Sequence, residues 1–260
     1  MTIPSTRHCE APTEPKQSRN QLYREYYLRY RTHVILLKIK DVTMIPEAYP
    51  RKLPKAILFD WDNTLVDTWR VAYDSINFAR SALGLAILTL EDFWQRPHHS
   101  MRDASPELFG ENFAEGERIF YEAVDKLHLL ELSTLKGAED LLKDLKIRGI
   151  YMGIVSNKEG NYLRKEVDHL GWKPHFHKVI GARDTKEDKP SPFPVLAALH
   201  ESSLVPGHDV WFVGDSIVDV YCARASGCIP VVVGHGEASQ EQDIIHAKDC
   251  QGLAQLITTL

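Results

Sequence analysis

Two aspartates with one residue between them, Asp60 and Asp62, are the first side chains whose type and spacing suit chemistry. They follow the apolar run Ala56–Phe59, which is typical of a short buried strand. Residues two apart on an extended segment face the same side, so both carboxylates can address one ligand. One carboxylate can attack a phosphorus atom, while the other donates a proton to the leaving alcohol. Turns also contain aspartates at this spacing, so the pair alone does not identify a site.

A second group of polar residues could bind a phosphoryl group. Ser156 and Asn157 follow the apolar run Ile150–Val155 and offer a hydroxyl and an amide to phosphate oxygens. Lys189 precedes the predicted start of a helix, and its ammonium group offers positive charge to the same oxygens. Each of these residues also has an ordinary interpretation, as a helix cap or as a solvated charge.

A third group, Asp215 and Asp219, could hold a metal ion. Both follow the apolar run Val210–Val213, and Gly214 at its end permits close approach of another group. Magnesium prefers oxygen ligands and keeps several waters, so a few carboxylates and a substrate phosphate suffice to bind it. Ligands of open α/β sheets bind beyond the carboxyl ends of the strands. The shared position of the three groups at such ends therefore argues against coincidence.

The elements that must position these residues are predicted by short apolar runs separated by helical spacing. The runs are apolar at successive positions, so both faces of the sheet should be buried, as in a parallel sheet. Alternation of strands and helices predicts an α/β fold with a doubly wound, Rossmann-like parallel sheet. The predicted strands are Ala56–Phe59, Ile150–Val155, Val210–Val213 and Ile229–Val233, with Lys178–Ala182 as a fifth candidate.

The segment 68–134 is predicted to be an inserted helical lid, or cap. About 90 residues separate the first two strands, which is too long for one crossover, and the segment shows only helical spacing. Thr89 with Asp92 is predicted to cap one of its helices, and Ser105 with Pro106 to begin another. Such a lid can exclude water from a site and supply specificity.

The rest of the chain divides into a core and an N-terminal extension. Residues 51–67 and 135–260 are predicted to form the sheet core. Residues 1–50 are predicted to be a basic extension, either disordered or not part of the native protein, with Met44 as the alternative start. A basic arm that touches a membrane or partner and an organelle-targeting segment are the other interpretations.

Charge, hydropathy and cysteine usage restrict the classes of partner. Residues 1–40 hold eight Lys/Arg against three Glu, so the remaining chain carries a net charge of −10. This acidic body argues against nucleic acid as a partner. No apolar run reaches the length of a membrane span. Four scattered cysteines without a disulfide-like framework predict a reducing, cytoplasmic location.

Four sequence motifs together resemble those of the haloacid dehalogenase-like hydrolase superfamily. They are DWDNT at 60–64, Ser156 in VSNK, Lys189 in DKPSP, and GDSIVD at 214–219. The resemblance covers about residues 55–235. The helical insertion after the first motif resembles the subgroup that contains phosphoglycolate phosphatases.

The resemblance implies roles for the residues that handle the phosphoryl group. Asp60 would be the nucleophile and Asp62 the general acid and base. Thr64 and Ser156, with Asn157 beside them, would bind the phosphoryl oxygens. Lys189 would neutralise charge on those oxygens and on the nucleophile.

The resemblance also implies a Mg²⁺ cofactor. Asp60 and Asp215 would ligate the ion by carboxylates, and Asp62 by its backbone carbonyl. Asp219 would ligate it directly or orient a bound water or Lys189. The expected activity is a phosphatase that hydrolyses a small phosphorylated metabolite through a phospho-aspartate.

Candidates for substrate contacts in the lid are His98, His99 and Arg102, because Arg102 could hold a carboxylate by a forked hydrogen-bond pair. Related phosphatases often have glycine where this chain has the two histidines, which leaves the glycolate assignment open. Dehalogenation is disfavoured because related dehalogenases lack a counterpart of Asp62. A phosphomutase and a non-catalytic phosphate- or partner-binding module stay as alternatives, and a monomer or homodimer is expected.

Overall fold

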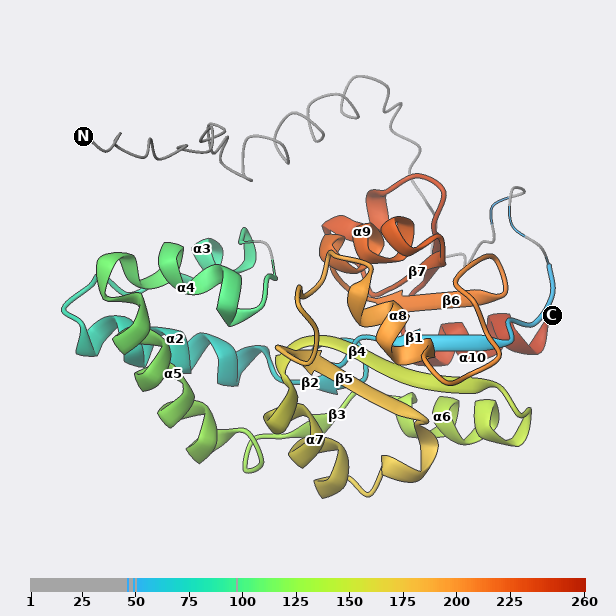
Figure 1. Cartoon of the computed structure of the whole chain (residues 1–260), viewed down its shortest axis with the longest axis horizontal. Helices are drawn as coiled ribbons and strands as arrows, with labels where there is room; N and C mark the ends of the chain where they lie inside the picture. Colours follow the sequence, from blue (N-terminus) through green and yellow to red (C-terminus); the bar gives the residue numbers. More distant parts are fainter. Residues whose placement is uncertain (1–45, 47–48, 50, 97) are drawn as a thin grey trace, which may run out of the picture. The chain divides into compact units, whose positions relative to one another are not determined.

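A six-stranded parallel sheet in the order β5-β4-β1-β6-β7-β8 forms the centre of the protein (Figure 1). This computed structural model describes residues 46, 49, 51–96 and 98–260. The predicted extension 1–50 therefore lies almost wholly outside the described residues. The strands are β1 Ala56–Phe59, β4 Tyr151–Glu159, β5 Lys178–Ala182, β6 Val210–Gly214, β7 Ile229–Val233 and β8 Ile245–Ala247.

Helices cover both faces of this sheet, which confirms the predicted doubly wound α/β fold. Ile57 and Phe59 of β1 pack toward α6 (Ala138–Ile147), α7 (Gly160–His169) and α10 (Cys250–Thr258). Ala56 and Leu58, which alternate with them, pack toward α8 (Phe193–Leu199) and α9 (Ile217–Ser226). All four β1 residues are fully buried, as a strand at the centre of such a sheet must be.

The second predicted strand is longer than its apolar run. β4 continues through Ser156 and Asn157 to Glu159, so these polar residues lie within the strand and do not follow it. The pairing register with β5 shifts between Val155 and Glu159. An irregularity of this kind bends a strand and re-aims its side chains, which hydropathy alone does not reveal.

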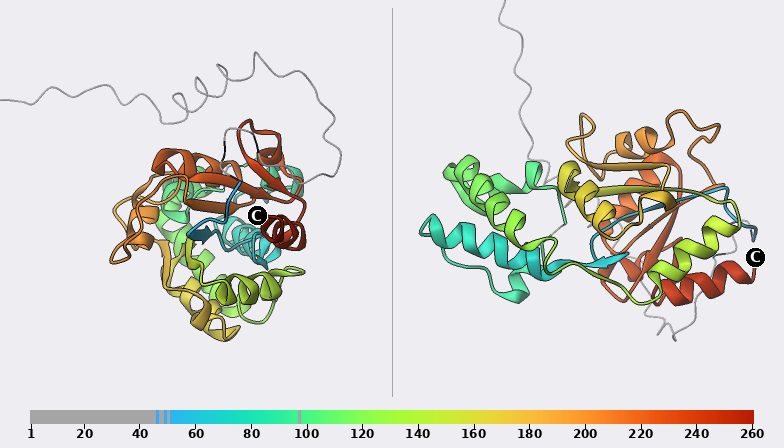
Figure 2. Two further views of the ribbon diagram at one scale, coloured as in Figure 1. Left: turned by 90° about the vertical axis from the view of Figure 1, so that its right-hand side faces the viewer. Right: turned by 90° about the horizontal axis from the view of Figure 1, so that it is seen from below.

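The segment 68–134 contains the helices α2 (Trp69–Ala82), α3 (Leu90–Trp94), α4 (Met101–Phe109) and α5 (Phe113–Leu127), with a short 3-10 turn, η2, at Gly110–Asn112. They gather beyond the end of the sheet at which β1 finishes (Figures 1 and 2). Their shared apolar core includes Ile76, Leu108, Phe109 and Phe120. The bounds of this insertion as a domain stay a prediction.

Local signals in the insertion were partly correct. Thr89 and Asp92 form a reciprocal capping box at the start of α3, as predicted. The predicted helix start at Ser105 and Pro106 is wrong, because α4 begins at Met101 and Pro106 lies inside it. The last two residues of α4, Leu108 and Phe109, are buried in the core of the insertion.

Several small elements have no clear signal in the sequence. The antiparallel pair β2 (Val66–Asp67) and β3 (Ser133–Thr134) joins the two ends of the insertion. The 3-10 turns η3 (Lys173–His175) and η4 (Glu237–Gln240) connect elements of the core. Among the described helices none is both long and apolar enough to cross a membrane.

Candidate active site

Three carboxylates meet at the carboxyl end of the sheet, where β1 and β6 finish side by side. Asp60 directly follows β1, and its backbone N–H donates to the carbonyl of Val213 over 2.8 Å. Asp215 and Asp219 follow β6, at the turn into α9 and in its first turn. One oxygen from each of the three carboxylates lies within 4.8 Å of the others. The sequence therefore predicted correctly that these residues would come together.

The Lys189 side chain lies among these acids. Its Nζ donates to Asp60 Oδ1 over 2.6 Å and to Asp219 Oδ1 over 2.7 Å, and the residue is only 2% exposed. Burial by itself would lower the pKa of Lys189, but the carboxylates of Asp219 and Asp60 outweigh this effect and raise it. Lys189 is therefore a fixed positive charge beside Asp60.

One lysine does not balance three carboxylates, of which Asp60 and Asp219 are buried and Asp215 is half-buried. Burial, opposed by Lys189 and reinforced by Asp219 and Asp62, raises the pKa of Asp60 to about 7. Burial and the charges of Asp219 and Asp60 also raise the pKa of Asp215 well above its ordinary value. Oxygen donors that repel one another at this spacing suit a hard divalent cation such as Mg²⁺, which would relieve the repulsion.

Gly214 allows the acids to approach this closely. A Cβ atom at position 214 would lie 2.3 Å from Cγ and 2.4 Å from Cβ of Asp219. Asp219 is held in this place by Ser216, whose backbone N–H donates to Oδ2 over 3.0 Å and whose hydroxyl donates over 2.6 Å. Asp219 is thus the partner of the N-cap Ser216 in the capping box of α9, and it also accepts a hydrogen bond from Lys189.

The second aspartate of the first motif, Asp62, is held outside the cluster of three acids. Lys158 Nζ lies 2.6 Å from Asp62 Oδ1, and the hydroxyl of Thr68 donates to the same oxygen. Neither partner was predicted from the sequence. Their only signals are that Lys158 follows Ser156 and Asn157 in the second motif and that Thr68 begins the predicted lid.

The residues predicted to bind phosphate lie around the same edge. Ser156 is buried and lines the cavity described below, and its Oγ accepts the backbone N–H of Lys158 over 3.2 Å. Asn157 has a bracing role in this structure: Nδ2 donates to the carbonyls of His98 and Lys189, each over 3.1 Å. Thr64 is fully buried, with Oγ1 3.3 Å from Asp215 Oδ1.

A cavity of about 210 Å³ extends from these residues into the insertion. Asp60, Asp62 and Lys189 form its polar end. His98 and His99 also line it, as expected for substrate contacts, and burial lowers the pKa of both imidazoles. Its wall on the insertion side is largely apolar, with Val71, Ala72, Ile76, Phe93, Met101, Leu108, Phe120 and Val124.

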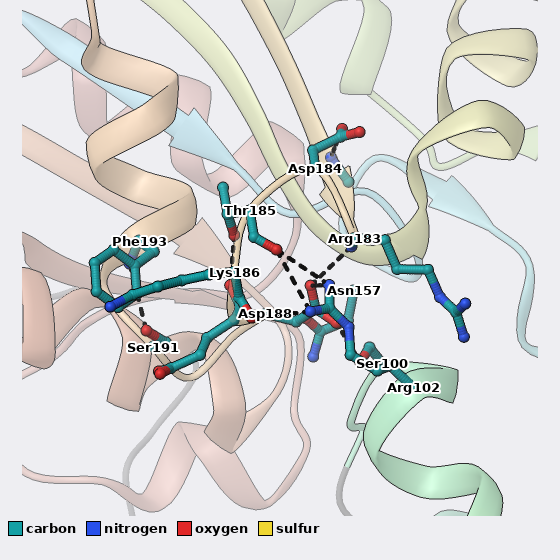
Figure 3. Close-up of polar contacts among 12 residues, drawn as sticks. Ser100, Arg102, Asn157, Arg183, Asp184, Thr185, Lys186, Asp188, Ser191 and Phe193 are labelled. Carbon is teal, nitrogen blue, oxygen red and sulfur yellow. Dashed lines mark hydrogen bonds and ion pairs between the residues drawn. The ribbon is translucent and has the colours of Figure 1, made fainter.

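Arg102 does not line this cavity, contrary to the expectation that it would hold a substrate carboxylate. Its Nη2 donates to Asp188 Oδ1 over 2.7 Å, and its Nη1 to the carbonyl of Lys186 over 3.0 Å (Figure 3). Ser100 Oγ donates to the other oxygen of Asp188 over 2.6 Å. The forked group predicted to bind a ligand therefore binds the loop that carries Lys189.

A second ion pair joins the insertion to the same loop, and in this pair the insertion carries the negative charge. Glu117 of α5 accepts a hydrogen bond from Arg183, which follows β5. The insertion thus contributes Arg102 and Glu117, and the loop contributes Asp188 and Arg183. Trp61, which lies between the two aspartates of the first motif, is fully buried in the core and does not line the cavity.

The chain is similar to known proteins over most of its length. The profile of the family described as haloacid dehalogenase-like hydrolase matches residues 57–233. A phosphoglycolate phosphatase from Chromobacterium violaceum is 30% identical over 194 residues, covering 71% of this chain and 86% of the relative. A HAD-superfamily hydrolase from Ehrlichia chaffeensis has 32% identity and a TM-score of 0.57, over 80% of this chain and 98% of that chain. A predicted phosphoglycolate phosphatase from Haemophilus somnus shares the fold, with a TM-score of 0.67 at 22% identity over 80% and 98% of the two chains.

Proposed function

The chain belongs to the haloacid dehalogenase-like hydrolase family, and from this premise we propose that it is a magnesium-dependent phosphatase acting on a small phosphomonoester. The observation that carries the proposal is the buried Lys189, held between Asp60 and Asp219 at the polar end of the cavity. A fixed cation beside a buried carboxylate is what an anionic nucleophile needs to approach an anionic phosphate.

In the first half of the reaction, a carboxylate oxygen of Asp60 attacks phosphorus and the bond to the leaving oxygen breaks. Asp62 gives its proton to that oxygen, so the alcohol departs neutral and Asp60 becomes phosphorylated. Ser156 and Lys189 both line the cavity, which supports the proposal that Ser156 binds the transferring oxygens and that Lys189 offsets their charge. The wall formed by the insertion excludes water from this step.

In the second half, Asp62 takes a proton from water as the water oxygen attacks phosphorus. The bond to Asp60 breaks, which releases phosphate and restores the enzyme. Asp60, Asp215 and Asp219 would hold Mg²⁺, with the Asp62 carbonyl as the further predicted ligand. When bound, the ion would neutralise charge on the phosphoryl group and on Asp60.

We propose a small phosphorylated metabolite as the substrate, with 2-phosphoglycolate as the first candidate because relatives are named for it. His98 and His99 are the proposed contacts to the leaving group. Arg102 is a poor candidate for binding the carboxylate of 2-phosphoglycolate, because its guanidinium already donates a hydrogen bond to Asp188. The apolar wall also suits larger leaving groups, which keeps other monoesters in the test.

Residues 68–134 are the proposed lid, and residues 51–67 with 135–260 the proposed catalytic core. We also propose that the protein works in the cytoplasm as a monomer or homodimer. The described cysteines, Cys222, Cys228 and Cys250, are free and buried, which suits a reducing compartment.

The test is phosphate release from a panel of small monoesters, with Mg²⁺ and with EDTA, by wild type, Asp60→Asn and Asp67→Asn. Asp67 is exposed in β2, so its variant is a matched control for the loss of one carboxylate. Release that needs Mg²⁺ and Asp60 but not Asp67 supports the proposal. A folded wild type that releases no phosphate contradicts it, and transfer of phosphate between sugar positions without release indicates a phosphomutase.

A further inference from the structure

Glu166 is a carboxylate at a helix position where the spacing predicts an apolar residue. On α7, Leu163 and Val167 point into the main core, and Glu166 is fully buried beside them. Burying a carboxylate is unfavourable unless donors and an opposite charge surround it. An apolar side chain at this helix position would avoid that cost, so the acid calls for a reason beyond packing.

Three donors from three other elements converge on this carboxylate. Lys158 Nζ of β4 donates to Oε1 over 2.9 Å and to Oε2 over 2.8 Å. Trp61, which follows β1, donates from Nε1 to Oε2 over 2.7 Å. His128 Nδ1, at the end of α5, lies 3.0 Å from Oε1. An ionised carboxylate can only accept, so Nδ1 of His128 carries the proton.

Lys158 is shared between Glu166 and Asp62. Its Nζ lies 2.6 Å from Asp62 Oδ1, and only 14% of its side chain is exposed. Glu166 therefore fixes the ammonium group that holds Oδ1 of Asp62. Thr68, which follows the first motif in the sequence, donates a hydrogen bond to the same oxygen. Oδ2 of Asp62 is then the oxygen that can carry the transferred proton.

We propose that Glu166 is a positioning residue for Asp62, acting through Lys158. The inference rests on the proposed function, because it concerns the proton that Asp62 gives to the leaving oxygen. Trp61 and His128 orient the Glu166 carboxylate, so the core strand and the end of the insertion both contribute to the position of the acid.

The proposal predicts a dependence on the leaving group. Phenyl phosphate and p-nitrophenyl phosphate share a ring and differ chiefly in the acidity of the leaving phenol. The phenol oxygen needs a proton as its bond to phosphorus breaks, whereas nitrophenolate is a weaker base and departs as the anion. The ratio kcat/KM includes the steps up to this departure, so it reports acid catalysis even where later hydrolysis limits kcat.

The experiment measures kcat/KM for both esters with Mg²⁺ in wild type, Glu166→Gln, Lys158→Met and the double variant. Glutamine keeps the shape of Glu166 but offers only one acceptor oxygen to its three donors. We expect each single variant to lose about 10-fold or more on phenyl phosphate and less than about 3-fold on p-nitrophenyl phosphate. The double variant should lose no more than Lys158→Met alone.

Leu253→Ala is the control for general loss of stability, because Leu253 is fully buried in α10 and has no polar side chain that could join these hydrogen bonds. Leu253→Ala should leave the ratio of the kcat/KM values for the two esters unchanged. Trp61→Phe removes one donor to Glu166 but keeps a ring. It should lower kcat/KM selectively on phenyl phosphate, by less than Glu166→Gln does, and it replaces that variant if Glu166→Gln does not fold.

Equal losses on both esters, or no loss on either, would overturn the role of Glu166. The absence of turnover by wild type on both esters and on the wider panel would instead refute the proposed phosphatase. The two failures are therefore distinguishable.

Discussion

The guanidinium of Arg102 lies 2.7 Å from the buried carboxylate of Asp188, the residue directly before Lys189. The two residues are 86 positions apart, one in the insertion and the other in the loop between β5 and α8. Contacts of the insertion therefore reach the residue next to the lysine that neutralises Asp60. The insertion and the position of Lys189 should consequently be coupled.

Arg102→Met is expected to lower the free energy of unfolding by about 2 kcal/mol, because it removes the charged partner of a buried carboxylate. Arg148→Met is the matched control: both arginine side chains are 29% exposed, but the partner Asp144 is 38% exposed and Asp188 only 1%. The control should lower the free energy of unfolding by only about 0.5 kcal/mol. Urea unfolding measures both values.

The same variant separates two roles for Arg102. If it contacted a substrate carboxylate, Arg102→Met would raise KM for 2-phosphoglycolate and leave stability unchanged. We expect a loss of stability and a lower kcat, with similar effects on substrates with and without a carboxylate. A selective rise of KM for carboxylated substrates would contradict this expectation.

Asp215→Asn is expected to stabilise the protein in EDTA and to abolish its stabilisation by Mg²⁺. The substitution removes one of three mutually repelling carboxylates, so Tm in EDTA should rise by about 2–4 °C. At a Mg²⁺ concentration of 100 times Kd, the free energy of unfolding of the wild type should rise by about 2.7 kcal/mol. That of the variant should hardly change. Thermal unfolding with and without Mg²⁺ checks both, and an unchanged response to Mg²⁺ would exclude Asp215 as a ligand.

Gly214→Ala is expected to displace Asp219, because the new methyl group would lie within 2.4 Å of its side chain. Lys189 would lose one of its two carboxylate partners, so kcat should fall about 10- to 100-fold, and the free energy of unfolding should fall by about 2 kcal/mol. Gly207→Ala is the control, since no atom lies within 4 Å of a Cβ atom there. Comparable activity of the two variants would show that the close approach at Gly214 is unimportant.

Cys250 is expected to make the protein less stable at alkaline pH. Burial, with a smaller contribution from Asp249, raises the pKa of its thiol to about 12. Between the ordinary thiol value of 9.0 and this pKa, the unfolded chain is ionised while the folded chain keeps its proton. Ionisation therefore favours unfolding as the pH rises through this range. Urea unfolding under reductant at pH 8 and pH 10.5 should show a loss that Cys250→Ala reduces, and an equal loss in the variant would contradict this assignment.

The sequence by itself determined five of the six strands of the sheet and the residues at its edge, and only β8 (Ile245–Ala247) was not predicted. Apolar runs marked β1, β6 and β7 almost to the residue, because strands buried on both faces require apolar side chains at successive positions. The carboxyl ends of parallel strands meet at one edge of a sheet. Asp60 and Asp215, 155 positions apart, were therefore expected at the same edge, and they come together because β1 and β6 are neighbours in the sheet.

Only the tertiary structure decided what holds those residues and where the insertion attaches. Glu166 is 105 positions from Trp61, and Arg102 binds Asp188 without any periodic relation between them. Periodicity reports which face of an element is buried, and a buried glutamate or a paired arginine departs from that rule. Such polar partners are fixed by the packing of α5, α7 and the β5–α8 loop against one another. Their pairing appears only when the whole chain has folded.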